Sequence, residues 1–98
     1  MAAYVINDMQ VTDPALLEEY KKHSPATVAR FGGKFLVRGG RLETLEGDWS
    51  PSRLVILEFP DMASAQAWID SPEYAEARRL RQRASRSNIV VVEGVAPG

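Results

Sequence analysis

The sequence has no cysteine, a single histidine and no excess of charge of either sign. The lack of cysteine excludes disulfides, thiolate nucleophiles and thiolate metal sites. The 12 Lys and Arg residues against 13 Asp and Glu residues leave a formal net charge of −1, so no global field attracts nucleic acid or an anionic membrane. The start, MAAYVINDMQ, does not resemble a signal peptide, and no apolar run approaches the roughly 20 residues of a membrane helix. We therefore expect a cytoplasmic protein without nucleic-acid or membrane partners.

The residues that are present describe an ordinary globular domain. With 98 residues, 45% of them apolar and 26% charged, the chain fits one domain that spans residues 1–98. Hydrophobic periodicity predicts four strands and two helical segments. The strands are expected at residues 3–11, from residue 34 onward, at 53–59 and at 88–95, and the helices at 14–31 and 62–80.

Capping residues indicate where the helices begin and end. Thr12 or Asp13 can cap the first helix, and the glycines that follow residue 31 end it in a left-handed turn. Pro25 lies inside this helix and removes one of its backbone hydrogen bonds. Ser71 followed by Pro72 is a second start signal within the second helical segment.

The element order β-α-β-β-α-β predicts an α+β, ferredoxin-like fold, with a four-stranded antiparallel sheet and two helices on one face. Both faces of the strands are rich in apolar residues, so a monomer would expose on the order of several hundred Å² of apolar surface. A second copy packed sheet to sheet is the natural cover, and we expect a homodimer. Leu57 and Val91 are candidates for the surface that meets the partner.

Three segments resemble a known family. FGGKFLVRGG, LEGDWSPSRLVILEFPD and WIDSPEYAEARRLR are similar to the hallmark segments of small bacterial proteins called domain of unknown function 1330, and the likeness covers nearly the whole chain. The resemblance implies a dimeric α+β barrel, in which two sheets close around a cavity. Wider relatives include cofactor-free monooxygenases, lactone isomerases, haem-degrading enzymes and stress-induced proteins. The family has no established reaction, so the resemblance implies no catalytic residues.

Arg38 stands at the end of an apolar strand, directly before Gly39 and Gly40. Glycine inside a strand commonly marks a bulge, and we expect this pair to bend the strand as barrel closure requires. Arg38 would then point into the enclosed space, where it either binds a small anionic ligand or forms an ion pair within the chain or across the dimer. Asn7 and Asp8 are further polar residues for the same space. Arg53 is expected at its rim.

Three other side chains are candidates for the site. His23 is either a general base at the mouth of the cavity or a solvated helix histidine beside two lysines. Trp49, in a loop with glycine and proline, either walls the pocket, reaches the partner subunit or anchors the loop over the core. Tyr74 either contributes a phenol to the pocket or packs in the core, whereas Trp68 is expected in the core.

The segment RRLRQRASR contains the only strong charge cluster. Acidic residues share its helix and no aromatic residues interleave with the cations, so nucleic-acid binding is not favoured. We expect a solvated face whose cations complement the negative end of the helix dipole. Its members are Arg78, Arg79, Arg81, Arg83 and Arg86.

Two functions of different classes remain open. The first is a cofactor-free enzyme that acts on a small anionic or aromatic molecule in the barrel cavity. The second is a non-catalytic ligand-binding or stress-related homodimer. The sequence lacks the glycine-rich and histidine motifs of nucleotide and metal sites, so we expect no cofactor and no metal. Convergence of His23, Arg38 and Trp49 on one pocket would favour the enzyme, and their separation would favour the second function.

Overall fold

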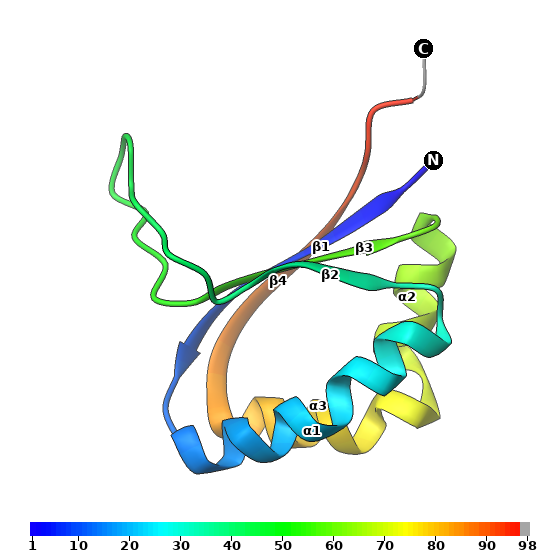
Figure 1. Cartoon of the computed structure of the whole chain (residues 1–98), viewed down its shortest axis with the longest axis horizontal. Coiled ribbons are helices and arrows are strands. Elements are labelled where there is room, and N and C mark those ends of the chain that lie inside the picture. Colours follow the sequence, from blue (N-terminus) through cyan, green and yellow to red (C-terminus); the bar gives the residue numbers. More distant parts are fainter. Residues whose placement is uncertain (97–98) are drawn as a thin grey trace.

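The chain folds into one layer of strands and one layer of helices. The computed structural model describes residues 1–96. Four strands form an antiparallel sheet in the order β2-β3-β1-β4, and the helices lie on one side of it (Figure 1). The predicted ferredoxin-like α+β fold is confirmed. The elements are β1 (Ala3–Val11), α1 (Pro14–Arg30), β2 (Lys34–Arg38), β3 (Leu54–Phe59), α2 (Met62–Asp70), α3 (Pro72–Ala84) and β4 (Ser85–Glu93).

The helices begin at the capping residues that the sequence indicates. Asp13 caps α1 by accepting from the Leu16 N–H at 3.1 Å. Ser71 ends α2 and caps α3, because its hydroxyl donates to the Trp68 carbonyl at 2.8 Å and accepts from the Tyr74 N–H at 3.1 Å. The second start signal therefore begins a separate helix, which runs to Ala84 and so beyond the predicted end at residue 80. Within residues 1–96, none of the helices is long and apolar enough to cross a membrane.

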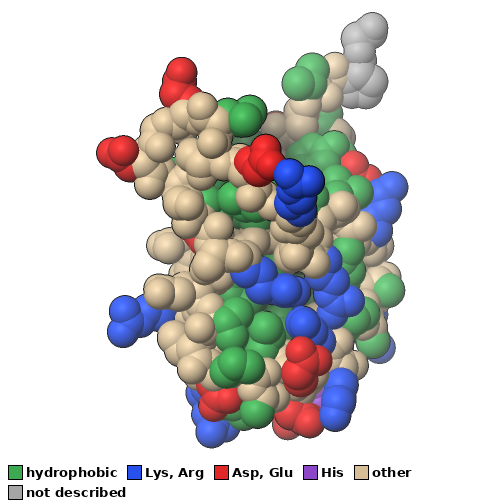
Figure 2. Space-filling model, turned by 60° about the vertical axis from the view of Figure 1, so that its left-hand side comes forward, with side chains coloured by type: hydrophobic (Ala, Val, Ile, Leu, Met, Phe, Trp, Pro, Cys, Tyr) green, Lys and Arg blue, Asp and Glu red, His purple; other side chains and the backbone are tan. Residues whose placement is uncertain are grey.

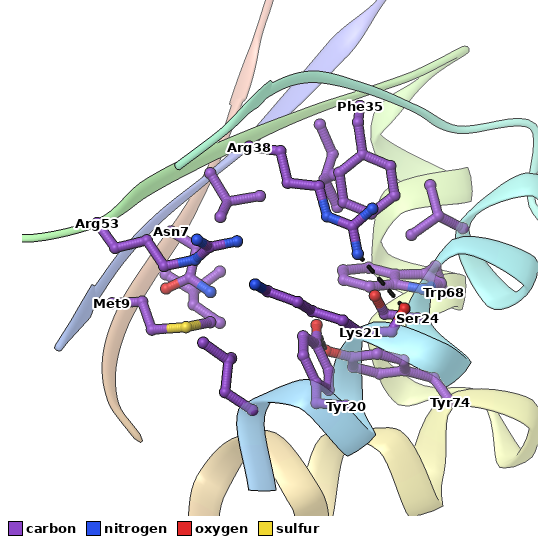
Figure 3. A pocket seen from close by; sticks show the side chains of 15 residues that line it. Asn7, Met9, Tyr20, Lys21, Ser24, Phe35, Arg38, Arg53, Trp68 and Tyr74 are labelled. Atoms are coloured by element: carbon purple, nitrogen blue, oxygen red, sulfur yellow. Dashed lines mark hydrogen bonds between the residues drawn. The ribbon is translucent and has the colours of Figure 1, made fainter. Parts of the chain in front are cut away.

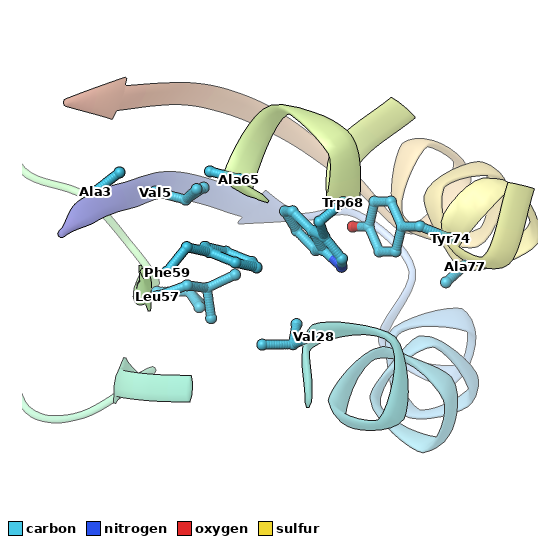
Figure 4. Close-up of a cluster of buried hydrophobic side chains, with 10 residues drawn as sticks. Ala3, Val5, Val28, Leu57, Phe59, Ala65, Trp68, Tyr74 and Ala77 are labelled. Atoms are coloured by element: carbon cyan, nitrogen blue, oxygen red, sulfur yellow. The ribbon is translucent and has the colours of Figure 1, made fainter. Parts of the chain in front are cut away.

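Alternate residues of the central strands face the helices and form the core (Figure 4). Trp68 is 2% exposed, and its ring centre lies 4.3 Å from that of Tyr74, so Trp68 is a core residue as predicted. Leu57 and Val91 both pair with the buried Val5 and pack in or against the same cluster. The prediction that they face a partner is wrong, because their positions along the strands point toward the helices.

The opposite face of the sheet stays uncovered by the described part of the chain. Ile6 and Ile56 pair there across β1 and β3 and are partly exposed. On the neighbouring β4, Val90 is 58% exposed and Val92 is 48% exposed. An apolar face of the predicted kind therefore exists, but different residues form it.

The second strand departs from the prediction. It ends at Arg38, and Gly39 leaves it with a φ of +69°. The bulge lies earlier, at Leu36, where the register with β3 shifts between Phe35 and Val37. The glycine pair is therefore the end of the strand and not the bulge. Residues 39–53 form a long loop that extends past the end of the sheet (Figure 1).

Candidate functional site

A cavity lies between the sheet and α1, and residues of α2 and α3 also line it (Figure 3). Its walls are mainly apolar, with Phe35, Val55 and Leu57 from the sheet and Leu17 and Val28 from α1. The cavity has a volume of about 30 Å³, which is enough for a few water molecules. A larger occupant would require the side chains at its edge to move.

Three cationic side chains line this cavity: Lys21 from α1, Arg38 from the end of β2 and Arg53 from the residue before β3. No carboxylate lines it among residues 1–96. Lys21 forms an ion pair with Glu18 at 3.1 Å, but neither arginine forms one within the described chain. In Figure 2, Lys and Arg side chains gather in the middle of the face, between the loop and the helices. The cavity therefore carries positive charge that the surrounding side chains do not balance.

The bulge at Leu36 turns Arg38 toward the helices. In a regular strand, side chains alternate between the two faces, so Phe35 and Val37 would face the helices and Arg38 would face away. The register shift changes this alternation, and Arg38 pairs with Val55, which is buried against the helices. The extra residue in β2 thus places the guanidinium on the side of the cavity.

Pro25 provides an acceptor for Arg38. Because proline has no N–H, the carbonyl one helical turn earlier, at Lys21, lacks its usual helix partner. Arg38 Nη2 donates to this oxygen at 3.4 Å. The Arg38 Cζ also lies 4.6 Å from the centre of the Phe35 ring, within the range of a cation–π contact. Neither contact neutralises the charge, so Arg38 can still bind an anion.

Arg53 reaches the cavity by lying directly against Gly39. A Cβ atom at position 39 would overlap Arg53 Nη1 and would lie 2.8 Å from Arg53 Cζ. The absence of a side chain at Gly39 therefore allows this position of the guanidinium. Arg53 Nε is buried and has no hydrogen-bond partner within the described residues.

Asn7 is a second buried polar group without a partner. Asn7 is 7% exposed, and its Oδ1 accepts no hydrogen bond from any residue in the range 1–96. Asn7 and Arg53 both project into the cavity (Figure 3). An unpaired buried acceptor costs about 1–3 kcal/mol, so its presence at a cavity points to an occupant that donates to it.

Two phenols supply hydroxyl groups at the same cavity. The Tyr20 and Tyr74 hydroxyls lie 2.7 Å apart, and Arg81 Nε donates to the Tyr74 oxygen at 3.3 Å. Burial, with a smaller contribution from Tyr74, raises the pKa of the Tyr20 phenol well above its usual range. Tyr20 therefore stays protonated at neutral pH and can donate a hydrogen bond, but it does not act as a base.

Comparison with protein families identifies the relatives of this chain. The model of the family described as domain of unknown function (DUF1330) matches residues 2–95. The chain belongs to the DUF1330 family. The resemblance that the three sequence segments carry is therefore confirmed. No curated protein matches the chain.

Solved structures share the fold of this DUF1330 chain. A protein of unknown function from Rhodopseudomonas palustris is 24% identical, with a TM-score of 0.75 over 98% of this chain and 84% of the other. A dimeric ferredoxin-like protein of unknown function from Jannaschia sp. CCS1 is 13% identical, with a TM-score of 0.70 over 96% and 100%. SnoaB, a cofactor-independent oxygenase from Streptomyces nogalater, is 15% identical, with a TM-score of 0.63 over 98% and 94%. At these identities the similarity shows the fold alone.

The DUF1330 chain brings two of the four predicted site residues together. Arg38 and Tyr74 line the cavity. His23 is exposed on α1 and does not line it. Trp49 is 61% exposed, and its indole N–H donates to Asp8 Oδ2 at 2.7 Å, on the face of the sheet away from the helices. His23, Arg38 and Trp49 therefore do not converge on one pocket, because the sheet separates Trp49 from the cavity.

The sequence did not indicate Tyr20 and Lys21 as site residues. The expectation that Arg53 lies at the rim is wrong, because Arg53 lines the cavity and its Nε is buried. Strand alternation could have indicated Arg53, because it has the same parity as the inward-facing Val55. The same alternation separates Asn7, which lines the cavity, from Asp8, which faces the other way.

The arginine cluster is less solvated than predicted. Arg81 is 6% exposed and Arg78 donates to the Ile69 carbonyl at 3.3 Å, so only part of the cluster faces solvent. Arg81 turns inward because it lies on the same buried face of α3 as Tyr74 and Ala77, at three- and four-residue spacing. Within residues 1–96, no group of three His, Asp or Glu side chains is placed to hold a metal ion.

Proposed function

We propose that this DUF1330 protein binds a small organic anion in the cavity between the sheet and α1. The observation that carries the proposal is the set of three cations, Lys21, Arg38 and Arg53, around an apolar cavity that no carboxylate lines within the described chain. Like charges that line one cavity repel one another, and Arg53 Nε is buried without a partner within the described residues. A bound anion would reduce the repulsion and would satisfy Arg53 Nε.

The arrangement supports binding better than catalysis. The acid and base groups that work near neutral pH, His, Asp and Glu, do not line the cavity among residues 1–96. His23 lies outside it, and the raised pKa of Tyr20 keeps that phenol neutral. The cavity thus contributes hydrogen-bond donors and positive charge, which hold a ligand. The second of the two open functions, a ligand-binding homodimer, is the one that we retain.

The homodimer is part of the proposal. The uncovered face of the sheet presents Ile6, Ile56, Val90 and Val92 to solvent. Burial of apolar surface contributes about 25 cal/mol per Å², which makes a second sheet a favourable cover for it. The Jannaschia protein with the same fold is described as dimeric. We place the two sheets face to face, with one cavity in each subunit on the outer side of its sheet.

Thermal unfolding with small acids tests the binding proposal. We expect acetate and propionate to raise the Tm of the wild-type protein, because a ligand that binds only the native state stabilises it. Arg38→Met should keep the fold, since methionine retains much of the apolar stem, and should lose the rise because a hydrogen bond to a charged group contributes about 1.5–3 kcal/mol. Arg79→Met is the matched control, since Arg79 is exposed on α3 and does not line the cavity.

The proposal fails if the acids leave the Tm of the wild-type protein unchanged. It also fails if Arg38→Met responds to the acids as fully as Arg79→Met does. If Arg38→Met unfolds the protein without any acid present, Arg38 has a structural role instead.

A further inference from the structure

The cavity contains one unpaired donor and one unpaired acceptor. Arg53 Nε and Asn7 Oδ1 are both buried, and neither has a hydrogen-bond partner within residues 1–96. Among residues 1–96, these are the only two buried side-chain nitrogen or oxygen atoms without a hydrogen-bond partner. Both belong to residues that line the same cavity. An occupant that satisfies both must accept one hydrogen bond and donate another.

The two groups are close enough for one small molecule to contact both. Asn7 pairs with Val55 across β1 and β3, and the Met9 N–H donates to the Arg53 carbonyl at 2.8 Å. Asn7 and Arg53 are therefore diagonal neighbours on one face of an antiparallel pair. Such neighbours have Cβ atoms about 7 Å apart, so the polar ends of their side chains can reach one ligand.

The chemistry of the surroundings identifies the accepting group. The cations Lys21 and Arg38 line the same cavity as Arg53, so an anionic oxygen is the favoured partner for Arg53 Nε. A carboxylate only accepts hydrogen bonds, and it cannot satisfy Asn7 Oδ1. The ligand therefore needs a hydrogen-bond donor in addition to its carboxylate. A neutral hydroxyl suits this position better than an ammonium group, because Lys21, Arg38 and Arg53 line the same cavity. Because the cavity is small, at about 30 Å³, we place the hydroxyl on the carbon next to the carboxylate.

We propose that the cavity selects small 2-hydroxy acids, with the carboxylate at Arg53 and Arg38 and the 2-hydroxyl donating to Asn7 Oδ1. This inference rests on the proposed anion binding and adds the class of ligand to it. Water is the competing occupant, since a water molecule also donates and accepts. A 2-hydroxy acid differs from water because it carries a negative charge, which can pair with Arg38 and Arg53.

NMR titration of the wild-type protein with matched pairs of acids tests the selection. Glycolate is compared with acetate, and each enantiomer of lactate with propionate, so that each comparison differs in one hydroxyl. We expect glycolate and one enantiomer of lactate to bind about threefold to tenfold more tightly than their partners, as one added hydrogen bond to a buried acceptor implies.

Asn7→Leu should remove this preference, so that glycolate and acetate bind this variant equally well, because leucine has a similar size and no acceptor. Gln82→Leu is the control, since Gln82 is an exposed amide on α3 and lies outside this cavity. Should Asn7→Leu fail to fold, Asn7→Ala serves the same comparison.

The outcomes separate the two proposals. Equal affinity within both pairs, with binding still dependent on Arg38, overturns the hydroxy-acid inference and leaves anion binding in place. A preference that survives in Asn7→Leu also overturns it. If no acid gives saturable shifts, water alone fills the cavity and both proposals fall.

Discussion

At the scale of single residues, Gly39 differs from the other glycines of the loop because its lack of a side chain leaves space for the Arg53 guanidinium. It combines a φ of +69° with close contact to Arg53. Gly47 has a similar φ of +88°, but a Cβ atom there would meet nothing within 4 Å. Gly40 has neither a positive φ nor a neighbour within 4 Å of such an atom. Substitutions at these three positions can therefore distinguish the effect of a positive φ from the effect of displacing Arg53.

Alanine at position 39 should weaken the binding of small acids. The added Cβ would displace the Arg53 guanidinium, which is flexible enough to move, and the loss of a charged hydrogen bond implies an affinity about tenfold lower. Gly47→Ala carries the cost of a positive φ without that displacement and should bind as the wild type does. Gly40→Ala should change neither property. The affinities are measured by calorimetric titration of the three variants with propionate. Equal affinities of Gly39→Ala and Gly47→Ala would show that Gly39 does not act through Arg53.

At the scale of secondary-structure elements, the local signals in the sequence were sufficient for the starts of the helices. Asp13, Asp61 and Ser71 cap the helices that follow them, because capping depends on residues only a turn away. The same holds for Gly32, whose φ of +79° ends the turn after α1. These features involve neighbours in the chain, so a single sequence contains the information for them.

The position of the bulge could not be predicted from the sequence. The glycines at 39 and 40 were the local signal for one, but the bulge lies at Leu36, a residue with no unusual backbone preference. Register depends on which side chains of β2 meet which side chains of β3. Phe35 opposite Leu57 and Arg38 opposite Val55 are pairings that the structure fixes through packing of the whole sheet.

Trp49 shows the same limit for a loop. The loop around it allowed a pocket wall, a contact with the partner subunit or a loop anchor, and the choice among these depends on a hydrogen bond to Asp8, far away in the sequence. Asp8 belongs to the strand parity that faces away from the helices, so Trp49 lies over the uncovered face of the sheet. Predicting this required knowledge of the path of the loop, for which residues 39–53 carry no periodic signal.

At the scale of the whole molecule, the uncovered face of the sheet determines the expected assembly. We expect wild-type protein at micromolar concentration to have the mass of a dimer by light scattering. Val90→Asp should shift it toward monomers, because a charge on this face would be buried without a partner. Leu45→Asp is the control, since Leu45 is 93% exposed in the loop and lies outside the sheet. A wild-type monomer, or equal behaviour of the two variants, contradicts the dimer.

The most direct test of anion binding is the position of a heavy anion in crystals of the wild-type protein. Crystals soaked in sodium bromide would be measured at the bromine absorption edge, where anomalous scattering separates bromide from water. We expect an anomalous peak inside the cavity, within hydrogen-bond reach of Arg38 or Arg53, that disappears when lactate is added to the soak. A cavity that holds only water, with bromide confined to the outer surface, would contradict it.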